Sequence, residues 1–479
     1  MGIKAKIFAT LTASTAMCLS MVVDANSMSL QEAIQKTLDT NPQIQQAAKN
    51  REAIEFELRQ ARGLYMPSID LESGIGRRRL ASPSSGSLTS DRDYLSPSDV
   101  SLTITQTLFD GGERRSEVER QASRVDGASF RVQERSEALA LEAAQAYLEY
   151  LLQAQIVGAA KQNSGFHQQI LGDIDTSIKG GTLTDADRLQ GRERLEASKA
   201  RLQEALEELE LTKIRFLRVV GEPIGKATAP QSIAKYLPRT LDDAIFIAKN
   251  GNPRISAATS DIDAADAQVR GARAAYLPKV NLEVSALTGN DYGGDSGNTN
   301  DFQARVVARW NLYRGGIDTA REQEQIRRAS EMRMALYDSH REVEESVRSA
   351  WNERVNRSAL AATLGRQSGT NAELVSSYRQ QFTVGERSLL DVLDAQNTRF
   401  NTSVLAQTAK FVAMFAEYKI LAATGQLTST FGGAAVTQAN AYARKEFAVP
   451  ATPANPNYVE VESHQSADMP FDLLAPIRQ

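Results

Sequence analysis

The sequence predicts a membrane protein of mixed helix and strand, built from one structural unit that occurs twice. Three observations predict this fold class. The chain opens with an export signal, its second half repeats the first at a nearly fixed spacing, and each half joins long polar helices to two strands of membrane-spanning length. The chain has 479 residues, 42% hydrophobic and 24% charged, which argues against general disorder and against a helical membrane protein.

Charge and metal-binding residues exclude several classes of function. The 55 Lys and Arg residues nearly balance the 59 Asp and Glu residues, so the net charge of −4 gives no electrostatic basis for binding nucleic acid. The single cysteine, Cys18, and the three histidines, His167, His340 and His464, lie far apart in the chain. They form no recognisable zinc or iron–sulfur ligand set and no disulfide, so we expect neither metal nor cofactor.

The N-terminus has the pattern of an export signal. Lys4 and Lys6 precede an apolar stretch over residues 7–23, and small residues follow at a suitable cleavage position. We therefore predict a signal peptide over residues 1–25. The alternative is a membrane anchor, but the stretch is shorter than the roughly 20 apolar residues that span a bilayer. Cleavage would remove Cys18, whose preceding residues fit a lipid-attachment motif poorly.

The two halves of the chain share three motifs in the same order. These are Leu-x-x-Ala with a later Asn-Pro, Tyr-x-Pro, and Leu-aromatic-x-Gly-Gly. They pair residues 30–42 with 241–253, 65–67 with 276–278, and 108–112 with 312–316. The offset is 211 residues at first and then 204, so the first copy carries seven more residues in one loop. A register kept this long indicates a duplicated fold.

The motifs divide the mature chain into two repeats and two connecting segments. The first repeat covers residues 26–220 and the second covers 241–425. Residues 221–240 contain three prolines and are predicted to link the two repeats, in the equatorial (middle) region of the molecule. The C-terminal tail, 426–479, is rich in Ala, Pro, Ser and Asn, and we expect it to be partly disordered.

Each repeat contains one long and two shorter helical segments. They are predicted over 30–64, 113–179 and 184–220 in the first repeat, and over 241–275, 316–381 and 388–424 in the second. The long segments lack proline and would extend about 100 Å at 1.5 Å per residue. Apolar residues in the last helix follow a three-four heptad spacing, which predicts helices packed side by side. An ordinary helical bundle would show similar stripes.

Each repeat also contains a pair of strands, predicted within 65–110 and 276–314. Apolar and polar residues alternate over about 10 residues per strand, as in transmembrane β-strands, and aromatic residues lie near the strand ends. Ser/Gly/Asp/Asn-rich loops at 77–98 and 288–301 join the strands. Because the smallest membrane barrels have about eight strands, four cannot close one. Several protomers would have to share a barrel, two copies supplying 8 strands and three supplying 12.

On these motifs the chain resembles the TolC family of outer-membrane channel proteins. The stretch 384–395, VGERSLLDVLDA, adds a further specific match, and the resemblance covers the mature chain to about Leu427. It implies a homotrimer whose 12-stranded β-barrel in the outer membrane continues into a 12-helix α-barrel across the periplasm. It also implies an exit duct for type I secretion or efflux, joined by a periplasmic adaptor (membrane fusion) protein to an inner-membrane ABC or proton-driven pump.

The resemblance also indicates where the periplasmic mouth lies. The helix–helix turns contain Gly180 and Gly181 in the first repeat and Val384 and Gly385 in the second, and they are expected to contact the adaptor. Asp391 and Asp394, three residues apart on one helix face, correspond to the family's constriction. In a trimer they would form two rings of three carboxylates that attract cations. The alternative is a solvated acidic helix face.

A gate latch is also implied by the resemblance. Arg387 corresponds to the arginine that holds the closed mouth, and Asp187 is the matching acid in the neighbouring turn region. The family tyrosine five residues before that arginine is Phe382 here, so its hydroxyl bond to Asp187 cannot form. The latch is therefore weaker, or rebuilt with Asp185.

Two competing functions remain at this point. Catalysis would have to use acidic groups such as Asp261, Asp263 and Asp266, which we interpret as a solvated helix face; without a nucleophile–base set we predict no enzyme. A periplasmic coiled-coil adaptor or scaffold without a pore would share the long helices, but would not need the strands. Within the channel interpretation, the match to secretion-type members favours type I secretion.

Overall fold

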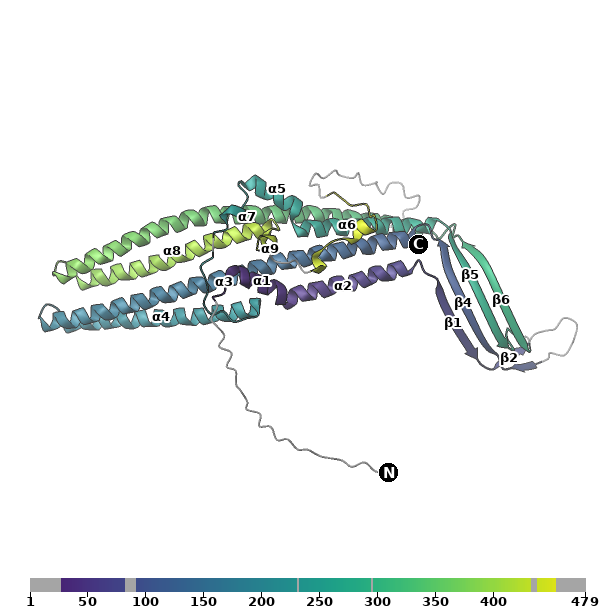
Figure 1. The fold of residues 1–479 in the computed structure, drawn as a ribbon, viewed down its shortest axis with the longest axis horizontal. Helices are drawn as coiled ribbons and strands as arrows, with labels where there is room; N and C mark the ends of the chain where they lie inside the picture. Colours follow the sequence, from purple (N-terminus) through teal and green to yellow (C-terminus); the bar gives the residue numbers. More distant parts are fainter. Residues whose placement is uncertain (1–26, 82–91, 231, 294–295, 432–436, 454–479) are drawn as a thin grey trace, which may run out of the picture.

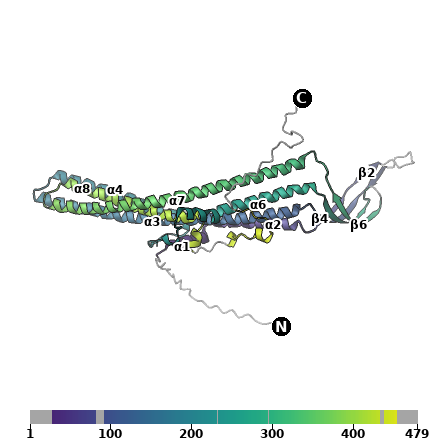
Figure 2. The ribbon, with the colours of Figure 1, turned by 90° about the horizontal axis from the view of Figure 1, so that it is seen from above.

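The computed structural model describes residues 27–81, 92–230, 232–293, 296–431 and 437–453. The predicted signal peptide, 1–25, lies outside these residues, as does the end of the predicted tail from 454 onward. The chain is elongated, with a β-sheet at one end and two helical hairpins at the other (Figure 1). Figure 2 shows the same arrangement from a perpendicular direction, with α3 and α7 running the length of the helical part.

Four long helices form the two hairpins. The first pairs α3 (Glu113–Lys179) with α4 (Asp185–Val220), and the second pairs α7 (Ile317–Thr383) with α8 (Leu389–Ala423). Both α3 and α7 have 67 residues, which at 1.5 Å per residue is about 100 Å. Helix α3 also contacts α8, so the two repeats lie side by side. Among the described residues, no helix is both long enough and apolar enough to cross a bilayer.

The first helical segment of each repeat is divided in two, a difference from the single helices predicted over 30–64 and 241–275, whereas the segments predicted over 184–220 and 388–424 are single helices. The divided segments form α1 (Leu30–Thr40) and α2 (Pro42–Gly63), and α5 (Leu241–Gly251) and α6 (Pro253–Arg273). At each break an Asn side chain caps the second helix, and a Pro occupies its first position. Proline is tolerated there because that position needs no N–H donor, whereas it would interrupt a continuous helix.

The four long strands form one antiparallel sheet in the order β1-β4-β5-β6. These are β1 (Ser68–Ile75), β4 (Ser98–Phe109), β5 (Lys279–Asn290) and β6 (Asn298–Arg309). The register aligns apolar residues across all four strands in the row Ile69, Ile104, Val284 and Ala304. The adjacent row is polar, with Asp70, Thr103, Ser285 and Gln303. Side chains alternate between faces, so the sheet has one apolar and one polar face.

The predicted loop 77–98 contains a second small sheet. Strands β2 (Arg78–Ala81) and β3 (Arg92–Leu95) pair antiparallel beyond the end of the main sheet. The Arg78 guanidinium donates a hydrogen bond of 3.0 Å to the carbonyl of Gly293, in the loop of the second repeat. The seven extra residues of the first copy therefore belong to a loop that includes a hairpin.

The largest apolar core lies midway along the helices. It joins α1, α3, α4 and α8, with Tyr147, Phe216 and Tyr418 among its fully buried side chains. The Tyr147 hydroxyl lies 2.8 Å from the carbonyl of Met28 and 2.7 Å from that of Thr228, which attaches the N-terminal segment and the linker to α3.

The described part of the tail packs against the helices. It contains α9 (Leu427–Thr430) and α10 (Ala443–Glu446), and three buried acidic side chains receive its backbone N–H groups. Glu137 accepts from Leu427 and Thr428, Asp126 from residues 442–444, and Asp263 from Thr452.

The interpretation of Asp261, Asp263 and Asp266 as a solvated helix face was wrong. Asp263 is 1% exposed and pairs with Arg444, while Asp261 pairs with Arg131 and Asp266 with Arg333. The acidic spacing places these groups where α6 meets α3, α7 and the tail. Each carboxylate thus has a cationic partner on another element.

Candidate functional site

The tips of the two hairpins have the same backbone geometry. In the first, the Thr182 N–H donates to the Ser177 carbonyl over 3.0 Å, and Gly181 has φ +75°. In the second, the Glu386 N–H donates to the Gln381 carbonyl over 2.9 Å, and Gly385 has φ +79°. This six-to-one bond with a left-handed residue is the Schellman motif, which satisfies the last carbonyls of a helix. Glycine adopts the left-handed conformation without a Cβ clash.

The two acidic residues that follow the turns bond to the N-cap residues of α4 and α8, Thr184 and Ser388. The Asp187 carboxylate accepts hydrogen bonds from the backbone and side chain of Thr184 at the start of α4, and these bonds lower the pKa of Asp187. Asp391 lies at the equivalent position of α8. There the Ser388 hydroxyl donates to the Asp391 carboxylate and accepts from the Asp391 N–H. Because 187 and 391 differ by the repeat offset, one capping device occurs twice.

Arg387 lies beside Asp391 rather than Asp187 within the described chain. Its guanidinium is 3.8 Å from the Asp391 carboxylate, donates to the Gln381 side chain over 3.1 Å, and lies over the Tyr378 ring. The predicted latch partners Arg387 and Asp187 are therefore not brought together inside one protomer. Phe382 packs into an apolar cluster between α3, α7 and α8.

Asp394 has a partner that the sequence did not suggest. Arg194 of α4 lies 3.5 Å from the Asp394 carboxylate, which is 59% exposed. His167 of α3 is buried, and this burial together with the charge of Arg194 lowers the pKa of its imidazole. No short-range sequence signal could have revealed Arg194, because its contact joins helices some 200 residues apart in the chain.

Polar contacts also join the two hairpins above the tips. The Gln396 amide donates to the Asn163 side chain over 2.8 Å, linking α8 to α3. Arg379 of α7 donates to Asp173 of α3 over 3.3 Å. Together with the apolar cluster at the tips, these contacts hold the hairpins side by side near the turns.

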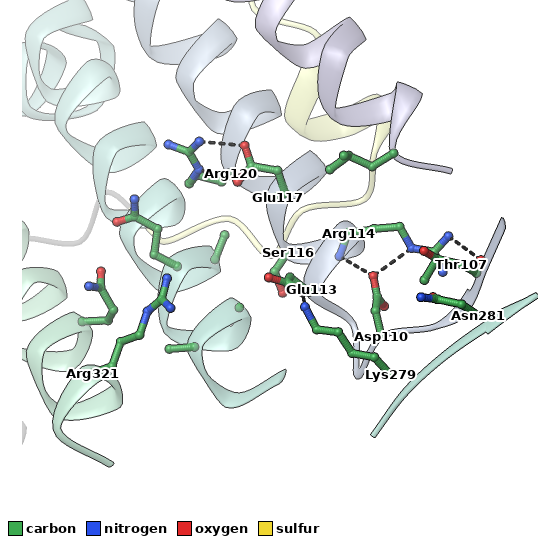
Figure 3. A pocket seen from close by; sticks show the side chains of 16 residues that line it. Thr107, Asp110, Glu113, Arg114, Ser116, Glu117, Arg120, Lys279, Asn281 and Arg321 are labelled. Atoms are coloured by element: carbon green, nitrogen blue, oxygen red, sulfur yellow. Dashed lines mark hydrogen bonds and ion pairs between the residues drawn. The ribbon is translucent and has the colours of Figure 1, made fainter. Parts of the chain in front are cut away.

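A charged cavity of about 790 Å³ lies where the sheet meets the helices (Figure 3). Its lining includes Thr107 and Asn281, which belong to the polar face of the sheet. In Figure 3 Arg120 contacts Glu117, and Arg114 contacts Asp110. Most charges of this wall are therefore paired within the chain. Over the described residues there is no group of three His, Cys, Asp or Glu side chains that could hold a metal ion.

Comparisons with known proteins agree with this architecture. The family described as "Outer membrane efflux protein" matches residues 33–222 and 245–426, one match for each repeat. The outer membrane efflux protein BepC of Brucella suis biovar 1 is 25% identical over 79% of this chain and 81% of its own length. The outer membrane protein TolC of Escherichia coli (strain K12) is 22% identical over 83% of this chain and 82% of its own.

A solved structure shares the fold. The CmeC outer membrane channel of Campylobacter jejuni superposes with a TM-score of 0.72 at 15% identity, covering 83% of this chain and 86% of that one. The predicted fold and resemblance are confirmed, and the pore-free adaptor alternative is not supported. Since the family matches both repeats, the chain belongs to the outer membrane efflux protein family, the TolC-type channels of efflux and type I secretion systems, which lie in the outer membrane and protrude into the periplasm.

Proposed function

We propose that three copies of this chain form the exit duct of a tripartite type I secretion or efflux system. The observation that carries the proposal is the sheet: four strands with one apolar face, one polar face and two edges, β1 and β6, that have no further strand paired to them within the described part of the chain. Apolar side chains on the first face are strongly exposed in one chain, for example Leu71 at 72% and Phe302 at 75%. Lipid would cover such a face, and pairing of β6 with β1 of the next copy would remove both edges.

The polar face and the charged cavity would then line the passage. Thr103, Glu283 and Arg305 lie on the same side of the sheet, and the cavity continues this side onto the helices. Exposed aromatic residues such as Trp310 and Tyr313 lie just beyond β6, where an aromatic belt would meet the membrane interface. Substrate would pass from the helical part through the sheet to the outside.

The hairpin tips would form the periplasmic mouth. Val384 is 70% exposed at the end of α7, and together with Gly180, Gly181 and Gly385 it offers a surface for a periplasmic adaptor protein. The adaptor would connect the duct to an inner-membrane pump. Removal of residues 1–25 on export would precede assembly.

The constriction and latch complete the proposal. Asp391 and Asp394 would form the two narrow rings, and Arg387 of one protomer would reach Asp187 of the neighbouring one. Within the chain Arg387 pairs with Asp391 at 3.8 Å, and pairing with Asp187 of the neighbouring protomer would take the place of this contact. Opening would move the hairpins relative to one another.

Single-channel recording in planar bilayers tests this function. The purified protein is compared with the double variant Asp391→Ala/Asp394→Ala. We expect a small cation-selective conductance whose selectivity and block by multivalent cations weaken in the variant. A conductance whose selectivity and block are unchanged by the substitutions would place the constriction elsewhere. A protein that stays soluble without detergent and forms no channel would overturn the proposal.

A further inference from the structure

We infer that Arg194 sets the ion selectivity of the periplasmic mouth by pairing with Asp394. The inference rests on the proposed constriction, and it assigns a role to a residue on a different helix and repeat. Arg194 belongs to α4 of the first repeat, whereas Asp394 belongs to α8 of the second. Its guanidinium lies 3.5 Å from the Asp394 carboxylate.

The Arg194 side chain is partly buried, with 34% of it exposed. Its Nε atom is buried and has no hydrogen-bond partner among the described residues. His167 is buried, and its lowered pKa keeps the imidazole neutral at physiological pH. Arg194 is therefore the cation that faces Asp394, and this histidine adds no second positive charge.

A second carboxylate shares the same guanidinium. Glu193 lies 3.5 Å from Arg194 Nε and is 65% exposed. Arg194 thus separates two carboxylates, and its loss would leave Glu193 and Asp394 both uncompensated. In a trimer that change repeats three times around the axis. Because a narrow opening focuses the field of its charges, such a change alters which ions enter.

The consequence is a mouth that selects cations less strongly than unpaired aspartates would. The Asp391 ring has its own arginine, Arg387, at 3.8 Å. Each proposed carboxylate ring is then accompanied by a ring of guanidinium groups. A mouth of alternating charge passes substrates of either sign more readily, because it presents dipoles to them rather than bare negative charge.

The test compares Arg194→Gln with Arg192→Gln in planar bilayers, using the full mature protein. Arg192 lies on the same helix, is exposed, and forms no ion pair among the described residues, so its substitution removes the same charge without unpairing Asp394. Two readouts are taken: the reversal potential in a KCl gradient, and block by hexaamminecobalt(III) added at the mouth. A third variant, Arg194→Lys, keeps the charge.

We expect Arg194→Gln to shift the reversal potential toward the value of a pore that passes cations only. The concentration of hexaamminecobalt(III) for half block should fall by roughly fivefold, from Coulomb's law with screening for three lost charges acting on a trivalent ion. Arg194→Lys and Arg192→Gln should stay near wild type. Adding Asp394→Asn to Arg194→Gln should reverse the shift.

Other results would overturn the inference. If Arg194→Gln equals wild type or equals Arg192→Gln, the pair does not control selectivity, although the channel remains. If the double variant keeps the full shift of Arg194→Gln, the effect does not act through Asp394. Should Arg194→Gln fail to assemble, Arg194→Met, which keeps the length and apolar stem of the side chain but removes its charge, replaces it in the same comparison. Absence of conductance in every protein, wild type included, would overturn the proposed function itself.

Discussion

The guanidinium of Arg444 lies 2.6 Å from the carboxylate of Asp263, and that carboxylate is 1% exposed. Arg444 also lies 3.2 Å from Asp126 of α3. Since α3 belongs to the first repeat and α6, which carries Asp263, to the second, one residue of the tail joins both repeats. The described part of the tail therefore holds the two repeats together, a role that its composition alone did not predict.

Loss of this buried pair should destabilise the helical part. Removing one partner of a buried ion pair typically costs about 3–5 kcal/mol, so we expect Asp263→Ala to lower the free energy of unfolding by that amount. Asp261→Ala, on the same helix but with a more exposed partner in Arg131, should cost at most about 1 kcal/mol. Denaturant unfolding in detergent measures both. Equal losses of unfolding free energy in the two variants would contradict this role of the tail.

At the strand-to-helix junction, replacing the glycine by alanine should destabilise the protein more in the first repeat than in the second. Gly111 has φ +67°, and a Cβ there would lie 2.9 Å from the Leu277 side chain and 3.0 Å from the Ala274 carbonyl. Gly315 has φ +63°, and no atom of the described residues lies within 4 Å of a Cβ built there. Both alanine variants incur about 1–2 kcal/mol of backbone strain, but only Gly111→Ala adds a clash. In thermal unfolding in detergent, Gly111→Ala should have a lower midpoint temperature than Gly315→Ala. The reverse order would be inconsistent with this packing.

Acidification should loosen the hairpin tips near His167. Burial and Arg194 lower the pKa of this imidazole from its ordinary value of 6.5. Below that value the unfolded state binds more protons than the folded one, so stability falls as the pH drops from about 6.5 toward the lowered pKa. Hydrogen exchange of peptides covering residues 163–178 should accelerate over this range. His167→Gln should remove the pH dependence there, while peptides around His340, also buried and with a lowered pKa, keep theirs.

The missing hydroxyl at Phe382 offers a test of the latch. Phe382 packs with Ile178 and Leu389 near the turns. We expect Phe382→Tyr to lower the open probability in planar bilayers, because a hydroxyl there could bond to the Asp187 carboxylate of the neighbouring protomer. The control measures the same Phe382→Tyr change in an Asp187→Ala background, which leaves the hydroxyl no acceptor at that position. A Tyr variant that gates like wild type would show that the latch is built from other residues.

Several parts of the fold could be predicted from the sequence because their signals are local. Alternation in the strands, such as Ile69 and Leu71 with Asp70 between them, predicts two faces whatever the partners are. The Asn41-Pro42 pair also indicates a helix break, because a capping residue is followed by a first-turn proline. One continuous helix was nevertheless predicted over 30–64. Likewise, Thr184 and Asp187 match the spacing of a capping box, so their structural role was visible in the sequence.

By itself the sequence determined the duplication, the helix and strand segments and the family, since each depends on residues close together in the chain or on a repeated register. The export signal over residues 1–25 stays a prediction. The tertiary structure alone decided which charges from distant parts of the chain meet. Asp394 and Arg194 are 200 residues apart in the chain, and Asp263 and Arg444 are 181 apart; both pairs are brought together only when the repeats and the tail pack. Coulomb energy depends on distance in space and on burial, and neither quantity is encoded in local spacing.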